Sequence, residues 1–182
     1  KTFDDRDKMS KKIHPLFITR GVPGTHDTYL VKKFFNSVKK IKFKEIKLPK
    51  FNKSIDDRLN KKHWTIIKKR PEIVIFEGWC VGAKPQTNSL IKKPINNLER
   101  YEDSNLVWRK YVNERLQKEY KKLFMMIDHF IFMKVPNFNM VFKWRYLQEN
   151  KLRKKLYFNK KVMSYDEIKR FIMFYQRITL QM

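Results

Sequence analysis

Four consecutive apolar residues, I-V-I-F at positions 73–76, stand between Pro71 and Gly78. Three of the four are β-branched, which favours a strand. A short run without polar alternation is typical of a strand that is buried on both faces, as in a parallel sheet. The run predicts a buried parallel strand that delivers Glu77 to the carboxyl edge of the sheet, where ligands bind in such folds.

The remaining pattern alternates helices with strands over the whole chain. Apolar spacing and capping signals predict a charged loop or exposed helix at residues 2–12, helices at 28–40, 104–124, 140–155 and from Ser164 onward, and further strands at 42–48 and 130–135. Ser164 and Glu167 have the spacing of a capping box. We therefore expect one α/β domain over residues 1–182, with a mainly parallel sheet flanked by helices.

The chain is strongly basic, with 43 Lys and Arg against 18 Asp and Glu and a formal net charge of +25. Such a balance often marks a protein that binds nucleic acid. The lysines are spread over nearly every segment, however, and a binding surface usually gathers them. We interpret the charge mainly as a solvated compositional bias and expect no specific nucleic-acid partner. A basic nucleic-acid-binding module, with aromatic rings among the lysines as stacking platforms, is the alternative.

Residues 20–27 read R-G-V-P-G-T-H-D and precede a predicted helix. Glycines and a proline shape a tight loop, and the helix amides together with an arginine provide an anion site. His and Asp side chains there are able to bind substrate hydroxyls, whereas a plain helix N-cap and a surface histidine are the alternative. The candidate substrate-binding residues of this segment are Arg20, Gly24, Thr25, His26 and Asp27.

Two more segments carry candidate residues. P-K-F-N-K-S at 49–54, with D-D-R at 56–58 directly after it, offers Lys50 and Lys53 toward a phosphate or carboxylate. W-R-Y-L-Q-E at 144–149 puts Arg145, Gln148 and Glu149 three and four positions apart, hence on one helical face. Arg145 and Glu149 are equally suited to pairing with each other.

Glu77 lies in F-E-G-W-C-V-G at residues 76–82, where it is suited to organising Mg²⁺ and its waters or to binding a hydroxyl. A solvated residue in a turn is the alternative. The sequence has no G-x-x-x-x-G-K-[ST] phosphate loop and no histidine or cysteine spacing for zinc. With Cys80 as its only cysteine and no signal-like apolar run, the chain is expected to be cytoplasmic and not to enter a membrane.

These four segments together resemble the D-glycerate 3-kinase family, which belongs with the uridine kinase, phosphoribulokinase and pantothenate kinase group of P-loop kinases. They are similar to the family patterns R-G-x-x-G-T-H-D, P-[RK]-[YF]-D-K-S, F-E-G-W-x-x-G and W-R-x-x-Q-E, in that order. The resemblance covers about residue 20 to the end of the chain. Asn52 departs from it, because an aspartate is usual at that position.

The resemblance implies a P-loop NTPase-like fold that is incomplete at both ends here. A phosphate loop would precede Lys1, and a last strand would follow Met182. It implies ATP-dependent phosphorylation of a small hydroxy acid, D-glycerate first, with Mg²⁺ as cofactor. Glu77 would act near the metal or the substrate. The residues that would bind substrate are Arg20, Gly24, Thr25, His26, Asp27, Lys50 and Lys53. Arg145, Gln148 and Glu149 would belong to the lid over the nucleotide. A kinase of the same group with a nucleoside or sugar phosphate as acceptor is the alternative, and the oligomeric state stays open.

Overall fold

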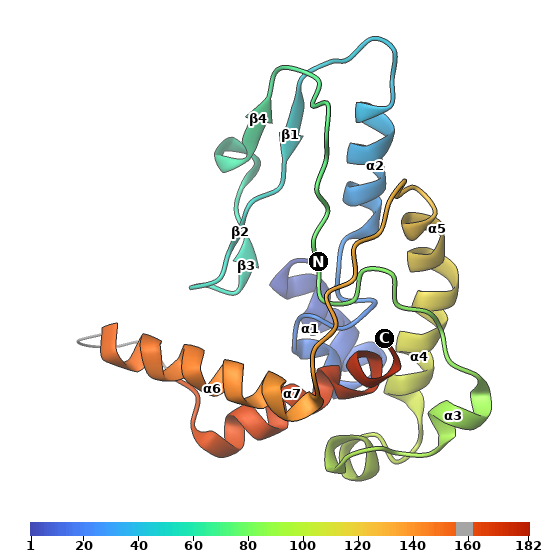
Figure 1. Cartoon of the computed structure of the whole chain (residues 1–182), viewed down its shortest axis with the longest axis vertical. Helices are drawn as coiled ribbons and strands as arrows, with labels where there is room; N and C mark the ends of the chain where they lie inside the picture. The colour runs from blue at the N-terminus through green and yellow to red at the C-terminus, as the bar shows by residue number, and fades with distance from the viewer. Residues whose placement is uncertain (156–161) are drawn as a thin grey trace. The chain divides into compact units, whose positions relative to one another are not determined.

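The computed structural model describes residues 1–155 and 162–182, which form two compact units (Figure 1). The first unit consists of Lys1–Gln86 and Val107–Asp128, and the second of Thr87–Leu106 and His129–Met182. The chain thus passes from the first unit to the second and back before it ends in the second.

The first unit contains short helices, two small β-ladders and a long helical segment. Its elements are α1 (Phe3–Lys12), η1 (Pro15–Ile18), α2 (Thr28–Val38), β1 (Ile46–Leu48), β2 (Phe51–Asn52), β3 (Asp57–Arg58), η2 (Lys61–His63), β4 (Thr65–Ile67), α4 (Val107–Arg115), η4 (Leu116–Tyr120) and α5 (Lys121–Phe124). Residues 2–12, predicted to be a loop or an exposed helix, form a helix whose first turn has a capping box at Thr2 and Asp5. The helix predicted from residue 28 begins there, with Asp27 as its N-cap.

The core of the first unit forms along residues 107–124, where α4, a π-helical turn (η4) and α5 follow one another along one axis (Figure 1). The predicted helix at 104–124 is confirmed except for its first residues. Its buried side recurs every three or four residues, as expected for a helix face that packs against a core. The buried apolar side chains are Trp108, Val112, Leu116, Tyr120, Leu123 and Phe124.

Both sheets are antiparallel and two-stranded. In the first, β1 pairs with β4 and Lys47 lies opposite Ile66. In the second, β2 pairs with β3 so that Phe51 lies opposite Arg58. The strand predicted at 42–48 is confirmed for residues 46–48. The chain is therefore α/β, but the described residues contain no parallel pair of strands.

The buried strand predicted at residues 73–76 is wrong for the described chain. The segment is irregular, and Ile73 and Ile75 are 80% and 88% exposed. A buried parallel strand needs a neighbour on each side, and within residues 1–155 and 162–182 no strand pairs with this run. The segment contacts the unit at one end, where the ring of Phe76 lies edge-on to Phe35 of α2 with centroids 5.4 Å apart.

The second unit is helical and consists of α3 (Asn88–Lys92), a π-helical turn η3 (Leu98–Glu102), α6 (Phe138–Lys155) and α7 (Tyr165–Gln181). The predicted capping box is confirmed, because the Ser164 hydroxyl accepts from the Glu167 amide and the Glu167 carboxylate accepts from the Ser164 amide. α6 and α7 pack against each other. The buried face of α7 consists of Ile168, Ile172, Phe174 and Ile178.

The strand predicted at residues 130–135 is also wrong for the described chain. The segment is irregular, and Ile131 and Met133 are 95% and 86% exposed. The reason is the same as for residues 73–76, because the described part of the chain supplies no strand beside it. None of the described helices is long and apolar enough to cross a membrane.

Candidate functional site

The loop at residues 20–27 is held in shape by its own hydrogen bonds. The fully buried Thr25 accepts from the Gly21 amide at 2.9 Å and donates to the Val22 carbonyl at 2.7 Å. Gly24 has φ +101°, and a Cβ there would lie 3.0 Å from the ring of Tyr111. A left-handed backbone and this close neighbour both require glycine. The candidates Gly24 and Thr25 thus shape the loop, and the Thr25 hydroxyl is already engaged within it.

His26 is fastened to Tyr120, a buried residue of η4. The Tyr120 oxygen accepts from the Gly24 amide at 3.0 Å and lies 2.7 Å from His26 Nδ1. Burial is the main cause that lowers the pKa of His26 to about 4, and the positive charge of Arg20 adds to it. His26 is therefore neutral near pH 7. We assign Tyr120 as the donor to Nδ1, which leaves the histidine proton on Nε2.

Asp27 caps α2 and also binds an arginine. Its Oδ1 accepts from the Leu30 amide at 3.2 Å, and its Oδ2 accepts from Arg58 Nη1 at 2.8 Å. Both residues line a hollow of about 160 Å³ in the first unit. The other residues that line this hollow are Lys1, Leu30, Pro49, Lys50 and Phe51.

Arg20 stacks on Phe51, one of the residues that line that hollow, but does not line it itself. Its guanidinium carbon lies 3.9 Å from the ring centroid of Phe51, and its Nε lies 3.4 Å from Oδ1 of Asp56. Asp56 has φ +48°, a left-handed conformation that Asp tolerates better than most residues. The buried Arg6 holds Asp56 in this position. Its Nη2 lies 2.8 Å from Oδ2 of Asp56 and donates to the Asp56 carbonyl oxygen at 2.7 Å.

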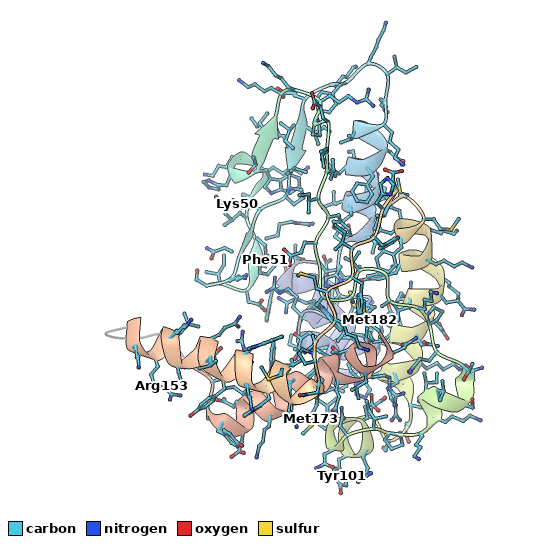
Figure 2. The ribbon with its side chains drawn as sticks, viewed as in Figure 1. Lys50, Phe51, Tyr101, Arg153, Met173 and Met182 are labelled. Carbon is cyan, nitrogen blue, oxygen red and sulfur yellow. The ribbon has the colours of Figure 1, made fainter. Side chains whose placement is uncertain are left out.

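The two lysines of segment 49–54 differ in position. Lys50 and Phe51 lie at the start of the β2–β3 hairpin (Figure 2), and Lys50 lines the hollow. Lys53 is exposed in the turn of the hairpin and does not line it. Asn52 Oδ1 accepts from the Ser54 amide at 2.9 Å and from its hydroxyl at 2.7 Å. An amide oxygen serves this turn as a carboxylate would, so the departure from the family pattern leaves the turn intact.

Glu77 is exposed and makes no hydrogen bond or ion pair with the rest of the described chain. Its neighbour Trp79 donates from Nε1 to the Gly21 carbonyl at 2.8 Å, which fastens segment 76–82 to loop 20–27. Among residues 1–155 and 162–182, no group of three His, Cys, Asp or Glu side chains is arranged to hold a metal ion. Glu77 therefore provides a single carboxylate and not a preformed metal centre.

The fourth candidate set lies in the second unit, between α6 and α7. Arg145 Nη2 and Glu149 Oε1 are 2.5 Å apart, and Arg145 Nη1 donates to Gln148 Oε1 at 3.3 Å. Glu149 is buried and also accepts from the Met163 amide at 3.1 Å. Of the two roles considered for Arg145 and Glu149, the structure shows the one in which they form an ion pair with each other. This set and the hollow belong to different units.

Sequence reasoning missed two residues that hold the site together. Arg6 lies in a charged segment that resembles a solvated helix, and Tyr120 is one apolar position among several on a long helix. Neither has a local pattern that separates it from its neighbours, because their partners are distant in sequence. For Arg58, which lines the hollow, the sequence did contain a local signal. The D-R dipeptide at 57–58 places a cation next to the turn of segment 49–54.

Comparison with known proteins points in one direction. The chain is 29% identical over 168 residues to an uncharacterized kinase of Schizosaccharomyces pombe, covering 89% of this chain and 58% of that protein. It is 26% identical over 140 residues to the chloroplastic D-glycerate 3-kinase of Arabidopsis thaliana, covering 74% of this chain and 28% of that one. No protein-family model matches.

The solved structures agree with these relatives. D-glycerate 3-kinase from Cryptococcus neoformans superposes with a TM-score of 0.78 at 25% identity, over 98% of this chain and 63% of that chain. The YGR205w protein superposes with a TM-score of 0.70 at 27% identity, over 97% of this chain and 60% of that one. The chain thus spans less than two thirds of the length of each of these relatives. In sequence and in fold, the chain is therefore similar to D-glycerate 3-kinases and to a relative named as a kinase.

Proposed function

We propose that the protein to which this chain belongs is a small-molecule kinase that transfers a phosphoryl group from ATP to a hydroxyl of D-glycerate. The observation that carries the proposal is the superposition on D-glycerate 3-kinase over 98% of the chain with a TM-score of 0.78. A likeness over nearly the whole chain, with motifs in the same order, is more specific than a shared fold alone.

The first unit is proposed to hold the acceptor. Its hollow is lined by cations, one carboxylate and apolar side chains, a composition that suits a small polar acid. Asp27 lines the hollow, Arg20 stacks on the ring of Phe51, and Gly24 and Thr25 keep the loop in shape. We propose that His26 and Arg20 reach the acceptor from the adjoining loop. Phosphoryl transfer depends mainly on positioning and on charge stabilisation, and a rigid loop provides the positioning.

ATP and Mg²⁺ are proposed to bind mainly to parts of the protein outside this chain. The described residues offer no metal cluster, and the sequence has no phosphate loop. Each of these relatives is longer than the part that this chain matches, which leaves room for such a segment. We further propose that the segment completes a mainly parallel sheet and one kinase domain with residues 1–182, and that the set on α6 lies near the nucleotide. A cytoplasmic location is part of the proposal, although the Arabidopsis relative is chloroplastic.

The test is a kinase assay on the full-length protein. ATP-dependent release of ADP, with mass spectrometry of the product, is measured with D-glycerate, L-glycerate, lactate, uridine, a pentose phosphate and pantothenate. We expect D-glycerate to give the highest kcat/KM and the product to carry one phosphate. Preference for uridine or a pentose phosphate would instead assign the chain to another kinase of the same group. No turnover with any acceptor would overturn the proposal.

Glu77→Gln is the matching residue test. If Glu77 acts on the reacting groups, loss of its charge should lower kcat about 30- to 1,000-fold, which is typical for one electrostatic contact in a transition state. Glu72→Gln is the control, because Glu72 is an exposed glutamate of the same segment. Equal turnover of the two variants would remove Glu77 from the active site.

A further inference from the structure

The hollow of the first unit has a charged side and an apolar side. Arg58 and Lys50 supply positive side chains, and Leu30, Pro49 and Phe51 supply apolar surface. Its volume of about 160 Å³ is well below the ~300–1,000 Å³ of pockets that take drug-sized ligands. The hollow therefore suits a compact ligand with one anionic end and a short carbon skeleton.

Arg58 is held in a fixed orientation beside this hollow. Strand pairing places it opposite Phe51, and the Leu59 amide donates to the Lys50 carbonyl at 2.8 Å, so the hairpin backbone is locked on both sides of the pair. Arg58 Nη1 donates to Asp27 Oδ2 at 2.8 Å, and its guanidinium carbon lies 5.9 Å from the ring centroid of Trp64. A guanidinium that is already ordered loses little conformational entropy when it binds a ligand.

The charges in the hollow do not balance. Asp27 is the only carboxylate among the residues that line it, and that carboxylate already serves the Leu30 amide and Arg58. Within the described part of the chain, Arg58 uses only Nη1 in a hydrogen bond from its side chain. The other N–H groups of its planar fork are therefore available for a second anion, and a guanidinium can bind carboxylate or phosphate through two parallel N–H bonds.

We propose that Arg58 binds the carboxylate of the acid acceptor, with Asp27 as the positioning residue that aims the guanidinium and Lys50 as a second cation. The carbon skeleton then lies against Leu30, Pro49 and Phe51. This rests on the proposed function, and it adds the reason for an acid acceptor: a neutral analogue would leave the cations of the hollow without an anion.

The experiment measures binding and turnover in the full-length protein. Calorimetry without ATP gives the Kd of D-glycerate, of glyceramide (its neutral amide) and of inorganic phosphate for the unmodified protein, Arg58→Gln and Arg70→Gln. Arg70 is the matched control, because it is an exposed arginine of the same unit that does not line the hollow. Kinase assays with the same proteins give KM and kcat for D-glycerate.

We expect Arg58→Gln to raise the Kd and KM for D-glycerate about 30- to 1,000-fold, the effect typical of removing one partner of a desolvated charge contact. Glyceramide binding should change less than threefold, because the amide lacks the charge, and Arg70→Gln should resemble the unmodified protein. Asp27→Asn should raise the KM for D-glycerate less than Arg58→Gln does. Partial rescue of KM by Arg58→Lys would support a charge contact.

Two results would overturn the inference. One is an unchanged Kd for D-glycerate in Arg58→Gln. The other is a loss of phosphate binding alone, which would make Arg58 a phosphate contact. The proposed function fails separately: if D-glycerate binds through Arg58 but is not phosphorylated, the carboxylate site stands and the kinase assignment falls.

Discussion

A single oxygen atom, the hydroxyl of Tyr120, joins the long helix of the first unit to loop 20–27. It binds the Gly24 amide and His26 Nδ1, and the residue is buried. The candidate site thus depends on a residue about a hundred positions away from the loop, and burial raises the pKa of this hydroxyl, so it stays protonated. A positioning contact of this kind is detectable only in three dimensions.

Tyr120→Phe should therefore destabilise the full-length protein by about 1–3 kcal/mol, because the buried Gly24 amide and His26 Nδ1 lose their partner while ring packing is kept. The midpoint of urea unfolding measures this. Tyr29→Phe serves as the control, since Tyr29 is 70% exposed and should change stability by less than about 0.5 kcal/mol. Equal midpoints for the two variants would show that the hydroxyl is not needed to hold the loop.

His26 makes the stability of the first unit depend on pH. Its pKa is lowered to about 4 in the folded chain, so between pH 6.5 and 4 the unfolded chain binds more protons and stability falls as pH falls. From pH 7 to pH 5, where most carboxylates stay ionised, the loss should be about 2 kcal/mol. Urea unfolding at both pH values checks this. His26→Asn should remove most of the difference, and an undiminished difference in that variant would assign it to other groups.

At the scale of elements, α7 is tied to the segment before α4 by ion pairs of two kinds. Arg177 donates to both oxygens of Glu99, whose side chain is fully buried, and to the carbonyls of Leu90 and Lys93. Arg170 pairs with Glu102 in the same direct way, but both of these side chains are largely exposed. The two pairs join the same elements, and they differ in burial and in the two carbonyl contacts that Arg177 adds.

Arg177→Met should cost about 3–5 kcal/mol of stability in the full-length protein, because the buried carboxylate of Glu99 loses the guanidinium that binds both of its oxygens. Arg170→Met should cost less than about 1 kcal/mol, because water replaces an exposed partner and screens the charge. Unfolding midpoints of the two variants, measured side by side, give the comparison. Similar losses in both would mean that burial does not govern the strength of these pairs.

The helices were predictable from the sequence because their signals are local. Asp27 as N-cap and the Ser164–Glu167 capping box each involve residues within one turn of one another. The apolar positions of residues 107–124 likewise recur every three or four residues. Strands were not predictable in this way: the two predicted at 73–76 and 130–135 are wrong for the described chain, since a strand also needs a neighbour that the apolar run itself cannot specify. The same distinction applies to the site. Loop 20–27 was found from its glycines, whereas Arg6 and Tyr120 act through distant partners.

At the scale of the whole molecule, the apolar runs at residues 73–76 and 130–135 expose side chains that a folded protein usually buries. Ile73, Ile75, Ile131 and Met133 are all at least 80% exposed. Burying one such side chain contributes about 1.5–3 kcal/mol, so these four together leave several kcal/mol unrealised in the described chain. The relatives extend well beyond the matched length, and a strand from that additional length would cover such runs and pair with their backbone.

We therefore expect the backbone amides of residues 73–76 and 130–135 to be strongly protected from hydrogen exchange in the full-length protein, because amides in the middle of a sheet exchange only through large opening reactions. Residues 39–44, between α2 and β1, are the internal control, since they are mostly exposed and lie outside helices and strands. Peptide-level hydrogen–deuterium exchange should show the two runs exchanging orders of magnitude more slowly than this control. Exchange as fast as the control would mean that no strand pairs with either run. The motif at 76–82 would then lie at the end of an irregular segment and not at the edge of a parallel sheet, and Glu77 would lose the fixed backbone on which its proposed role depends.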